Sequence, residues 1–240
     1  PNFATPGSST YTQVGTDLPL ASFDARSPNS RSVIEQPGIS GGLDAIADRL
    51  MFRLAYRNLG TVASPTNSWV LNFTVNVGGI TPTTAATYQA GIRWAELRRA
   101  GAAGAISVNQ QGTQSTNPGT PAGGTNLWMG SIAQDKDGNI LLGYSTSGSV
   151  SPDFPSIRYA GRLASDPAGT LAQGQTDGFL GTGVQNVAGN RWGDYSAMTV
   201  DPVDDCTFWY TTEYIQTTGT APWQTRVASF KFPNCALGPQ

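Results

Sequence analysis

Three arginines recur at matching places along the chain and are the first candidates for chemistry. Arg93, Arg158 and Arg226 follow one another at intervals of 65 and 68 residues. A guanidinium offers a planar fork of donors that suits a carboxylate, and sialidases use an arginine cluster to bind one. Positions that repeat in this way should lie at equivalent but separate places in the fold. We therefore expect structural arginines, each holding a carboxylate or carbonyl between neighbouring units.

A carboxylate beside a tyrosine is the second candidate arrangement. Glu213 stands three residues after Tyr210 and directly before Tyr214, and a carboxylate can activate a tyrosine nucleophile in sialidases. The Ser-x-Asp-x-Gly-x-Thr-Trp hairpin typical of those enzymes is absent as such. The chain also has no histidine, which removes the commonest general base and metal ligand. We therefore predict no catalytic residue, although the question of enzyme activity stays open.

Acidic residues around one glycine resemble the start of a calcium loop. Asp135, Asp137 and Asn139 flank Gly138, but the later bidentate acid of an EF-hand is missing. The Asp-Gly pair is also typical of a tight hairpin turn. A hairpin turn accounts for these residues, so we expect no cofactor, with calcium as the weaker alternative.

These residues belong to a sequence pattern that occurs three times. Asn126 and Trp128 match Asn190 and Trp192 at an offset of 64, and a more diverged copy precedes them. The repeat units cover about residues 43–115, 116–180 and 181–235. Each contains short strand-like runs separated by turns, which is typical of radially repeated β-sheets. We therefore predict an all-β fold, a β-propeller or part of one, with three to four blades of four antiparallel strands in a single domain.

The N-terminal residues resemble the last strand of a unit. Thr10 to Asp17 shares four identities with Thr170 to Asp177 at an offset of 160, in the pattern T-x-x-Q-x-x-T-D. Residues 1–20 should therefore hold an outer strand that completes another blade. Leu18 to Asp48 could hide a degenerate blade, two copies could join in one ring, or the chain could be the C-terminal part of a larger propeller. We favour the last two, and leave a short helix at Gly42 to Ala47 open.

Two cysteines lie in the last repeat unit. Cys206 opens one strand-like run and Cys235 follows another. If these runs form an antiparallel hairpin, the two residues lie opposite each other, and a disulfide is geometrically natural. A disulfide in turn indicates an oxidising compartment.

Residues at the start of the inner strands are the best candidates for ligand recognition. In a propeller the loop that enters an inner strand lies at the mouth of the central channel. Here that loop would carry Trp128 in one unit and Arg191, Trp192, Asp194 and Tyr195 in the next. Aromatic and charged side chains there suit a sugar or a peptide, but the two tryptophans could instead wedge between blades.

Composition limits the choice of partners and location. Only 12% of residues are charged and the net charge is −2, which gives no electrostatic reason to expect nucleic acid. No run is long and apolar enough to insert into a membrane. The sequence starts at Pro1, without Met or an apolar signal-peptide core. A mature secreted or cell-surface protein therefore fits best.

Several strings resemble a family of large secreted bacterial proteins to which no activity is assigned. These strings are NRWGDYSAMTVDPVDDCTFWYTTEY, TRVASFKFPNC, DRLMFRLAYRNLG, WMGSIAQDKDGNILLGYS and SIRYAGRLASDP, and together they cover most of residues 32–235. The resemblance implies secretion and a sialidase-like or related β-propeller. We therefore expect a non-enzymatic extracellular scaffold or binding module that assembles with copies of itself or with other chains. The alternative is a sialidase-like, carbohydrate-active enzyme with its site at the channel mouth.

Overall fold

The protein is built almost entirely of β-strands. The computed structural model describes residues 2–10, 13, 17–25, 31–47, 49–79, 87–120, 123–186 and 191–235. Apart from the 3-10 helix η1 (Pro6–Ser8), every regular element in these residues is a strand, and the strands form four antiparallel sheets. The prediction of an all-β fold is confirmed. No helix in the described part of the chain is long and apolar enough to cross a membrane.

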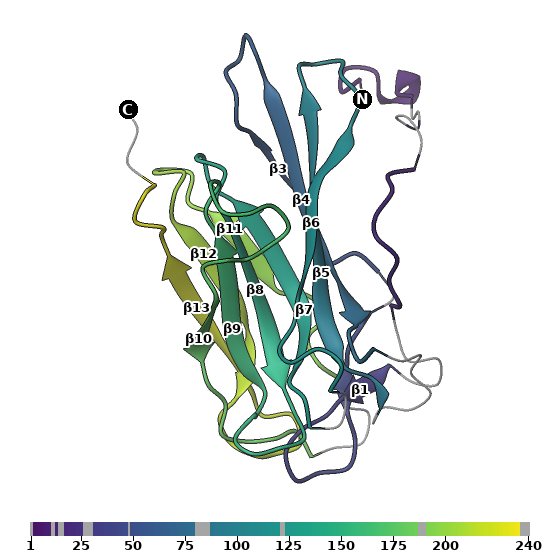
Figure 1. The fold of residues 1–240 in the computed structure, drawn as a ribbon, viewed down its shortest axis with the longest axis vertical. Helices are drawn as coiled ribbons and strands as arrows, with labels where there is room; N and C mark the ends of the chain where they lie inside the picture. Colours follow the sequence, from purple (N-terminus) through teal and green to yellow (C-terminus); the bar gives the residue numbers. More distant parts are fainter. Residues whose placement is uncertain are drawn as a thin grey trace.

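Three larger sheets follow one another along the chain (Figure 1). The first sheet has the order β3 (Ala55–Asn58), β4 (Thr66–Asn76), β5 (Ala90–Ala100), β6 (Ser107–Gln114). The second has β7 (Asn126–Gln134), β8 (Ile140–Ser147), β9 (Ser156–Arg162), β10 (Gln175–Phe179). The third has β11 (Ala197–Val200), β12 (Phe208–Ile215), β13 (Trp223–Phe230). The strands of each sheet therefore all lie within one of the three repeat units.

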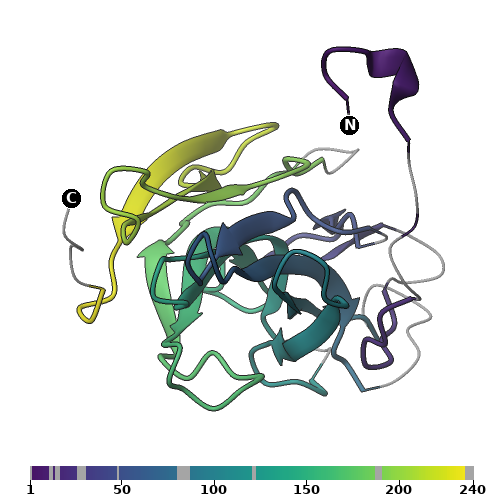
Figure 2. The ribbon, with the colours of Figure 1, turned by 90° about the horizontal axis from the view of Figure 1, so that it is seen from above.

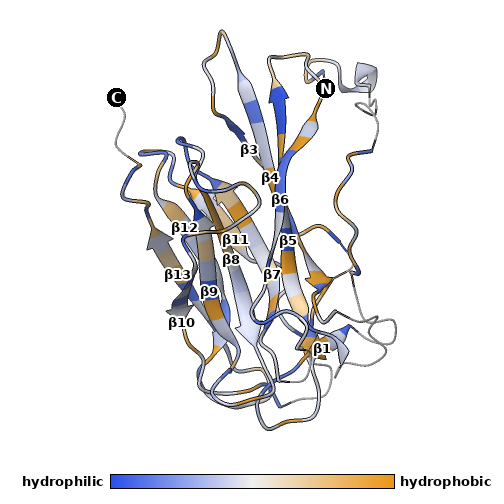
Figure 3. Ribbon diagram, viewed as in Figure 1, coloured by the Kyte–Doolittle hydropathy of each residue, from blue (hydrophilic) through white to orange (hydrophobic). Residues whose placement is uncertain are grey.

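The sheets are stacked face to face in chain order, as the view from above shows (Figure 2). Trp94 of the first sheet and Tyr144 of the second lie in one buried cluster, and Leu141 and Tyr210 lie in another between the second and third sheets. Figure 3 shows hydrophobic and hydrophilic residues interspersed along β9 and β5. Apolar side chains that alternate along a strand bury one face, so a sheet with two neighbours needs apolar residues on both faces.

One side chain of the first sheet, Arg57, links it to the other two units. Arg57 of β3 donates from Nε to the Gln134 carbonyl at 2.8 Å and from Nη2 to Asp205 Oδ1 at 3.1 Å. Gln134 belongs to the second sheet, and Asp205 lies in the β11–β12 turn. One side chain therefore contacts all three units.

A small fourth sheet packs against the starts of the second and third units, where its Ile34 and Leu43 lie in one cluster with Trp128 and Trp192. Its two strands are β1 (Ser32–Ile34) and β2 (Leu43–Asp44). Residues 43–44 are extended because they pair with β1, and the described residues 42–47 form no helix. The helical alternative left open for Gly42 to Ala47 is therefore wrong, because strand pairing overrides the helix-forming composition.

The segment before β1 covers part of the outward face of the first sheet. The ring of Phe23 lies 4.7 Å from that of Phe73, and the Asn76 N–H donates to the Asp24 carbonyl at 2.7 Å. The described residues between 18 and 47 supply only β1 and β2, so they form no fourth four-stranded sheet. The outer strand was predicted within residues 1–20, on Thr10 to Asp17. Residues 11, 12 and 14–16 lie outside the described residues, and the described residues of 1–20 form η1 and no strand. No closed ring of sheets is formed by the described residues, so the propeller stays a prediction.

The third sheet differs from the other two because it has three strands. Its last strand, β13, is an edge strand that pairs only with β12 among the described residues. Cys206 and Cys235 form the predicted disulfide, with their Cα atoms 5.7 Å apart. The disulfide joins the beginning of β12 to the end of β13, so it fixes the hairpin that forms this edge.

Candidate functional site

The two repeated tryptophans lie in the core. Trp128 and Trp192 are buried with their ring centroids 5.4 Å apart, in a cluster that includes Ile34 and Leu43 of the small sheet. The Trp192 indole N–H donates to Ser145 Oγ at 3.2 Å. The rings therefore hold the starts of the second and third units together. This arrangement agrees with the interpretation in which the two tryptophans wedge between units and do not bind a ligand.

The other mouth residues line a pocket beside this core. Arg191 and Asp194 stand at its exposed rim and form an ion pair at 2.9 Å. The pocket has a volume of about 400 Å³ and is lined by Arg191, Trp192, Gly193, Asp194, Glu213, Trp223 and Thr225. Tyr195 lies outside this lining, half-exposed, with its ring centroid 6.3 Å from that of Phe52. The structure thus gathers three of the five predicted residues at one pocket.

Strand register places two polar side chains in the pocket. Glu213 of β12 is the cross-strand partner of Thr225 of β13, and paired residues of an antiparallel sheet point to the same face. Trp223 lies two residues before Thr225 and therefore on that face too. Its indole N–H donates to Gln185 Oε1 at 2.6 Å, which sets the position of the ring.

The surroundings of Glu213 shift the pKa of its carboxyl. Partial burial raises the pKa of its carboxyl, the Gly193 backbone N–H opposes this by donating to the carboxylate, and the Asp194 charge adds to the rise. A Cβ at residue 193 would collide with the Glu213 carboxylate, so only glycine allows this close approach. The pocket therefore holds a carboxyl group that binds its proton more tightly than an exposed one does.

The carboxylate–tyrosine pair is not assembled. Tyr210 and Tyr214 share the face of β12 that packs toward the second sheet, where both rings are buried. Tyr214 Oη donates to Gln224 Oε1 at 2.9 Å. Glu213 has the opposite orientation, because side chains alternate along a strand. Neither tyrosine lines the pocket with Glu213.

The three repeat arginines lie on three separate sheets and have different partners. Arg93 Nη1 donates to Gln111 Oε1 at 3.3 Å, on the neighbouring strand β6. Arg158 Nε donates to Asp177 of β10 at 2.7 Å. Each of these two arginines therefore binds the fourth strand of its own sheet, and no common ligand site is formed.

Arg226 is the exception among the repeat arginines. Its guanidinium carbon lies 5.3 Å from the ring centroid of Tyr214 and 5.7 Å from that of Phe179. No carboxylate of the described residues lies within ion-pair distance of it. The strand that supplies a polar partner in the other two sheets is the one that the third sheet does not have.

The residues suggested as a calcium loop form a hairpin turn. Asp135 Oδ1 accepts the backbone N–H groups of Asp137 and Asn139 at 3.0 and 2.9 Å. Asp135 Oδ2 accepts the Asn139 side-chain amide at 2.8 Å. Across the described residues, no group of three acids or cysteines lies close enough together to hold a metal ion.

The outward face of the third sheet is the largest feature that the sequence did not predict. We use this name for the side that faces away from the second sheet. Trp209, Trp223 and Val227 lie on it and are 41%, 50% and 65% exposed. They alternate with residues that face the second sheet, so the sequence shows the two-residue period of a β-strand at these positions. Which of the two faces would be covered could not be known without the neighbouring sheets.

Comparisons with protein-family models, with curated proteins and with solved structures return no match. The resemblance to secreted bacterial proteins therefore stays a prediction.

Replacing Glu213 by glutamine should stabilise the protein at neutral pH. A carboxyl whose pKa is raised in the folded state costs stability once the pH exceeds its unfolded value, and the full cost is reached above the folded value. We expect the melting temperature of Glu213→Gln to exceed that of the parent at pH 7. The difference should disappear below the unfolded pKa of glutamate, about 4.3, where the carboxyl is protonated in both the folded and the unfolded state. Scanning calorimetry at the two pH values measures this.

Asp194→Asn is the matched control because it removes a charge from the exposed rim of the same pocket. It should change stability by less than about 1 kcal/mol at either pH. A lower melting temperature for Glu213→Gln at pH 7 would mean that the bond from Gly193 outweighs the cost of burial.

Proposed function

We propose that this chain is a secreted, non-enzymatic scaffold or binding module of the β-propeller type, which acts by assembling with other protein chains. The observation that carries the proposal is the third sheet. Its edge strand, β13, pairs on one side only among the described residues, and its outward face has two half-exposed tryptophans. The first and second sheets, in contrast, bury their facing sides against each other.

Both features are typical of surfaces that receive another chain. An edge strand presents a row of backbone donors and acceptors that can pair with a further strand. An exposed apolar patch rimmed by polar residues marks an interaction surface. On this sheet the apolar residues are Trp209, Trp223 and Val227, and the polar rim includes Glu213 and Asp194.

The opposite end of the stack is also open. On the outward side of the first sheet, Leu50 lines a pocket with Phe23 and Phe73, and the exposed Tyr56 packs on Trp69 with ring centroids 5.5 Å apart. A stack with an apolar surface at each end favours assembly end to end, and a head-to-tail contact is the heterologous arrangement that forms rings when the rotation closes.

Secretion is part of the proposal because of the disulfide between Cys206 and Cys235. Disulfides persist in oxidising compartments and are rare in reducing ones. The disulfide stabilises the hairpin of β12 and β13, which forms the edge that we propose as the assembly surface.

The test is the molar mass of the native particle, measured by light scattering after size exclusion. We expect a multiple of the 25.2 kDa chain mass. Val227→Arg, which places a charge in the middle of the outward face, should shift the particle to the monomer mass. Val203→Arg is the control, because Val203 is 82% exposed in the β11–β12 turn, outside this face.

If the parent protein has the monomer mass at every concentration, the proposal that the chain assembles with copies of itself is wrong. The pocket lined by Glu213 and Trp223 would then become the leading candidate site. It would support the alternative of carbohydrate recognition, because the pocket combines a carboxyl group of raised pKa with an exposed indole. The buried positions of Tyr210 and Tyr214 do not favour a sialidase mechanism.

A further inference from the structure

We propose that the free edge of β13 binds Thr10–Asp17 of a second copy of this chain as a fourth strand, with Asp17 opposite Arg226. This inference rests on the proposed function, since it names the partner of the same surface. It is argued from the unfilled edge, from a sequence match, from an arginine that lacks an acidic partner and from the place where the N-terminal segment is attached.

The edge of β13 is unfilled in a specific way. The first two sheets are completed by a fourth strand, β6 or β10, which follows the third strand along the chain. The third sheet ends with its third strand, and none of the described residues forms a backbone hydrogen bond to the free side of β13. Within the part of the chain that the structure describes, the third sheet therefore lacks the strand that the repeat would place there.

The missing strand has a sequence counterpart at the other end of the chain. Thr10–Asp17 matches Thr170–Asp177 in the pattern T-x-x-Q-x-x-T-D. The second of these segments leads into and forms the beginning of β10, the fourth strand of the second sheet. Thr10, Gln13 and Asp17 are the described residues of the first segment. The match predicts that this segment takes the role of a fourth strand.

The second sheet gives the register of the proposed pairing. There Asp177 is the cross-strand partner of Arg158, and the two side chains form an ion pair at 2.7 Å. The third strands of the two sheets align because Arg158 and Ala160 correspond to Arg226 and Ala228.

By the same register Asp17, which corresponds to Asp177, comes to lie opposite Arg226. Arg226 now rests on two aromatic rings with no acidic partner among the described residues. The pairing therefore supplies the one ion pair that the repeat predicts and that the single chain does not form.

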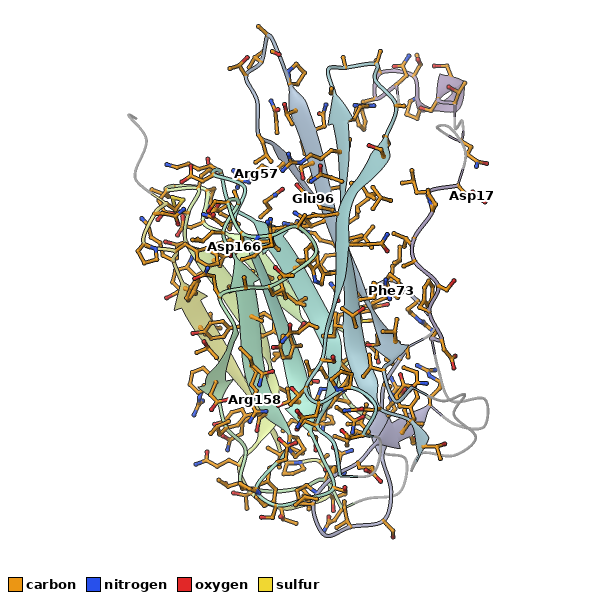
Figure 4. The ribbon with its side chains drawn as sticks, viewed as in Figure 1. Asp17, Arg57, Phe73, Glu96, Arg158 and Asp166 are labelled. Atoms are coloured by element: carbon orange, nitrogen blue, oxygen red, sulfur yellow. A yellow bond between two sulfur atoms is a disulfide. The ribbon has the colours of Figure 1, made fainter. Side chains whose placement is uncertain are left out.

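The partner is a second copy because of where the segment is attached. Asp17 lies on the opposite side of the molecule from β13 (Figure 4). The residues after it are fixed to the outward face of the first sheet, where Phe23 contacts Phe73 and the Asp24 carbonyl accepts from Asn76. A third sheet from another copy that packs on this face would bring its own β13 next to the segment.

The charges of the two faces agree with this head-to-tail contact. Arg93 and Arg99 lie on the outward side of β5, at positions that alternate with the buried Trp94 and Glu96. Glu213 lies on the side of the third sheet that would meet them, beside the ion pair of Arg191 with Asp194. Opposite charges on two apolar faces set the orientation of an interface.

The test is a cysteine cross-link between Asp17→Cys and Arg226→Cys. Directly opposed residues of an antiparallel pair have Cα atoms about 4.5–5.5 Å apart, within the range that a disulfide spans. When the two single variants are mixed and oxidised, we expect a band of twice the chain mass on a gel without reductant. Asp17→Cys mixed with Val203→Cys is the control and should give no such band above background.

A second measurement does not depend on cysteine chemistry. Asp17→Arg and Arg226→Asp should each raise the dissociation constant of the assembly about 5- to 10-fold, because each places like charges opposite each other. The chain that carries both changes should recover to within about 3-fold of the parent. If a single variant bound less tightly because it was misfolded, the second substitution would not restore the dissociation constant.

The outcomes separate this inference from the proposed function. If Val227→Arg dissolves the assembly but the cross-link and the charge exchange fail, the surface binds a partner and Thr10–Asp17 is not that partner. If the chain that carries both cysteines cross-links only within itself, the segment completes its own sheet, and the second copy is overturned. If the parent is a monomer and no cross-link forms, both proposals fall.

Discussion

Replacing Glu96 by alanine is expected to lower the free energy of unfolding by about 3–5 kcal/mol, because it removes a fully buried carboxylate that satisfies several donors. Glu96 lies on β5 on the side that faces the second sheet, and its side chain is not exposed (Figure 4). The five donors are Ser68 Oγ at 2.8 Å, Arg98 Nε at 2.8 Å, Asn109 Nδ2 at 2.8 Å, Gln110 Nε2 at 2.6 Å and Gln134 Nε2 at 3.0 Å. Chemical denaturation at pH 7 measures the loss.

The effect is large because four of these donors belong to the first sheet and one to the second. Gln134 comes from β7, so the carboxylate joins two sheets as well as three strands of its own. Without it, the buried donors of Ser68, Gln110 and Gln134 lose their acceptor in a place that water does not reach. Glu96→Gln keeps the shape and one acceptor oxygen but turns an amide N–H₂ toward other donors. We expect it to cost less, about 1–3 kcal/mol.

The same carboxylate should make the protein sensitive to acid. Burial alone raises the pKa of Glu96, but hydrogen bonds from Gln110, Gln134, Ser68 and Arg98 outweigh burial and place it below its usual range. Because the folded pKa is the lower one, the stabilisation is complete above the unfolded value and is lost as the pH falls through the folded value. The Glu96→Gln variant should lack this part of the acid dependence.

Asp177→Asn is the control for these variants. Asp177 forms an ion pair of comparable length with Arg158, but its side chain is 55% exposed, so its loss should cost less than about 1 kcal/mol. If Glu96→Ala lost no more stability than Asp177→Asn, the donors around Glu96 would have found other acceptors. Burial would then not determine how much this hydrogen-bond network stabilises the fold.

Loss of the disulfide is the second large effect that we expect. Cys206 and Cys235 close a loop with a sequence separation of 29 residues. Constraining a loop of this length in the unfolded chain corresponds to about 3–4 kcal/mol of stability. Denaturation with and without reductant, with mass spectrometry to verify the thiol state, gives the difference.

The double variant Cys206→Ala, Cys235→Ala separates the cross-link from the reductant. It should lose about as much stability as the reduced parent, and adding reductant to it should change nothing. A loss below about 1 kcal/mol would indicate that apolar packing holds the hairpin closed. That packing includes the edge-to-face contact of Phe208 with Phe232 at 5.9 Å.

Local sequence patterns predicted those features that depend on few residues. The turn at Asp137 and Gly138 was predictable because Gly138 has the positive φ, 84°, that such a turn needs. The disulfide followed from the position of each cysteine relative to a strand. The Gly42 to Ala47 segment was ambiguous because its conformation is determined by pairing with residues 32–34, which no local preference records.

The candidate site was harder to predict because it depends on contacts between distant residues. The two tryptophans were identified by their repetition, but a ring that fills a core and a ring that binds a sugar have the same sequence signal. Glu213 was considered as half of a pair with a tyrosine on the wrong face. Its actual neighbours, Gly193 and Trp223, come from a loop and from the next strand. The register of β12 with β13 places Trp223 on the face of Glu213, and the loop before β11 brings Gly193 to it.

The order of the sheets along the chain has a consequence for synthesis. Each of the three larger sheets consists of consecutive strands, so each can fold once its own residues have left the ribosome, because domains fold from the N-terminal side during translation. Arg57 is the exception, since its two partners, Gln134 and Asp205, are made 77 and 148 residues later. The first sheet is therefore complete as a sheet long before its inner strand is fixed, and a ribosome that stalls before residue 205 leaves that strand without its last anchor.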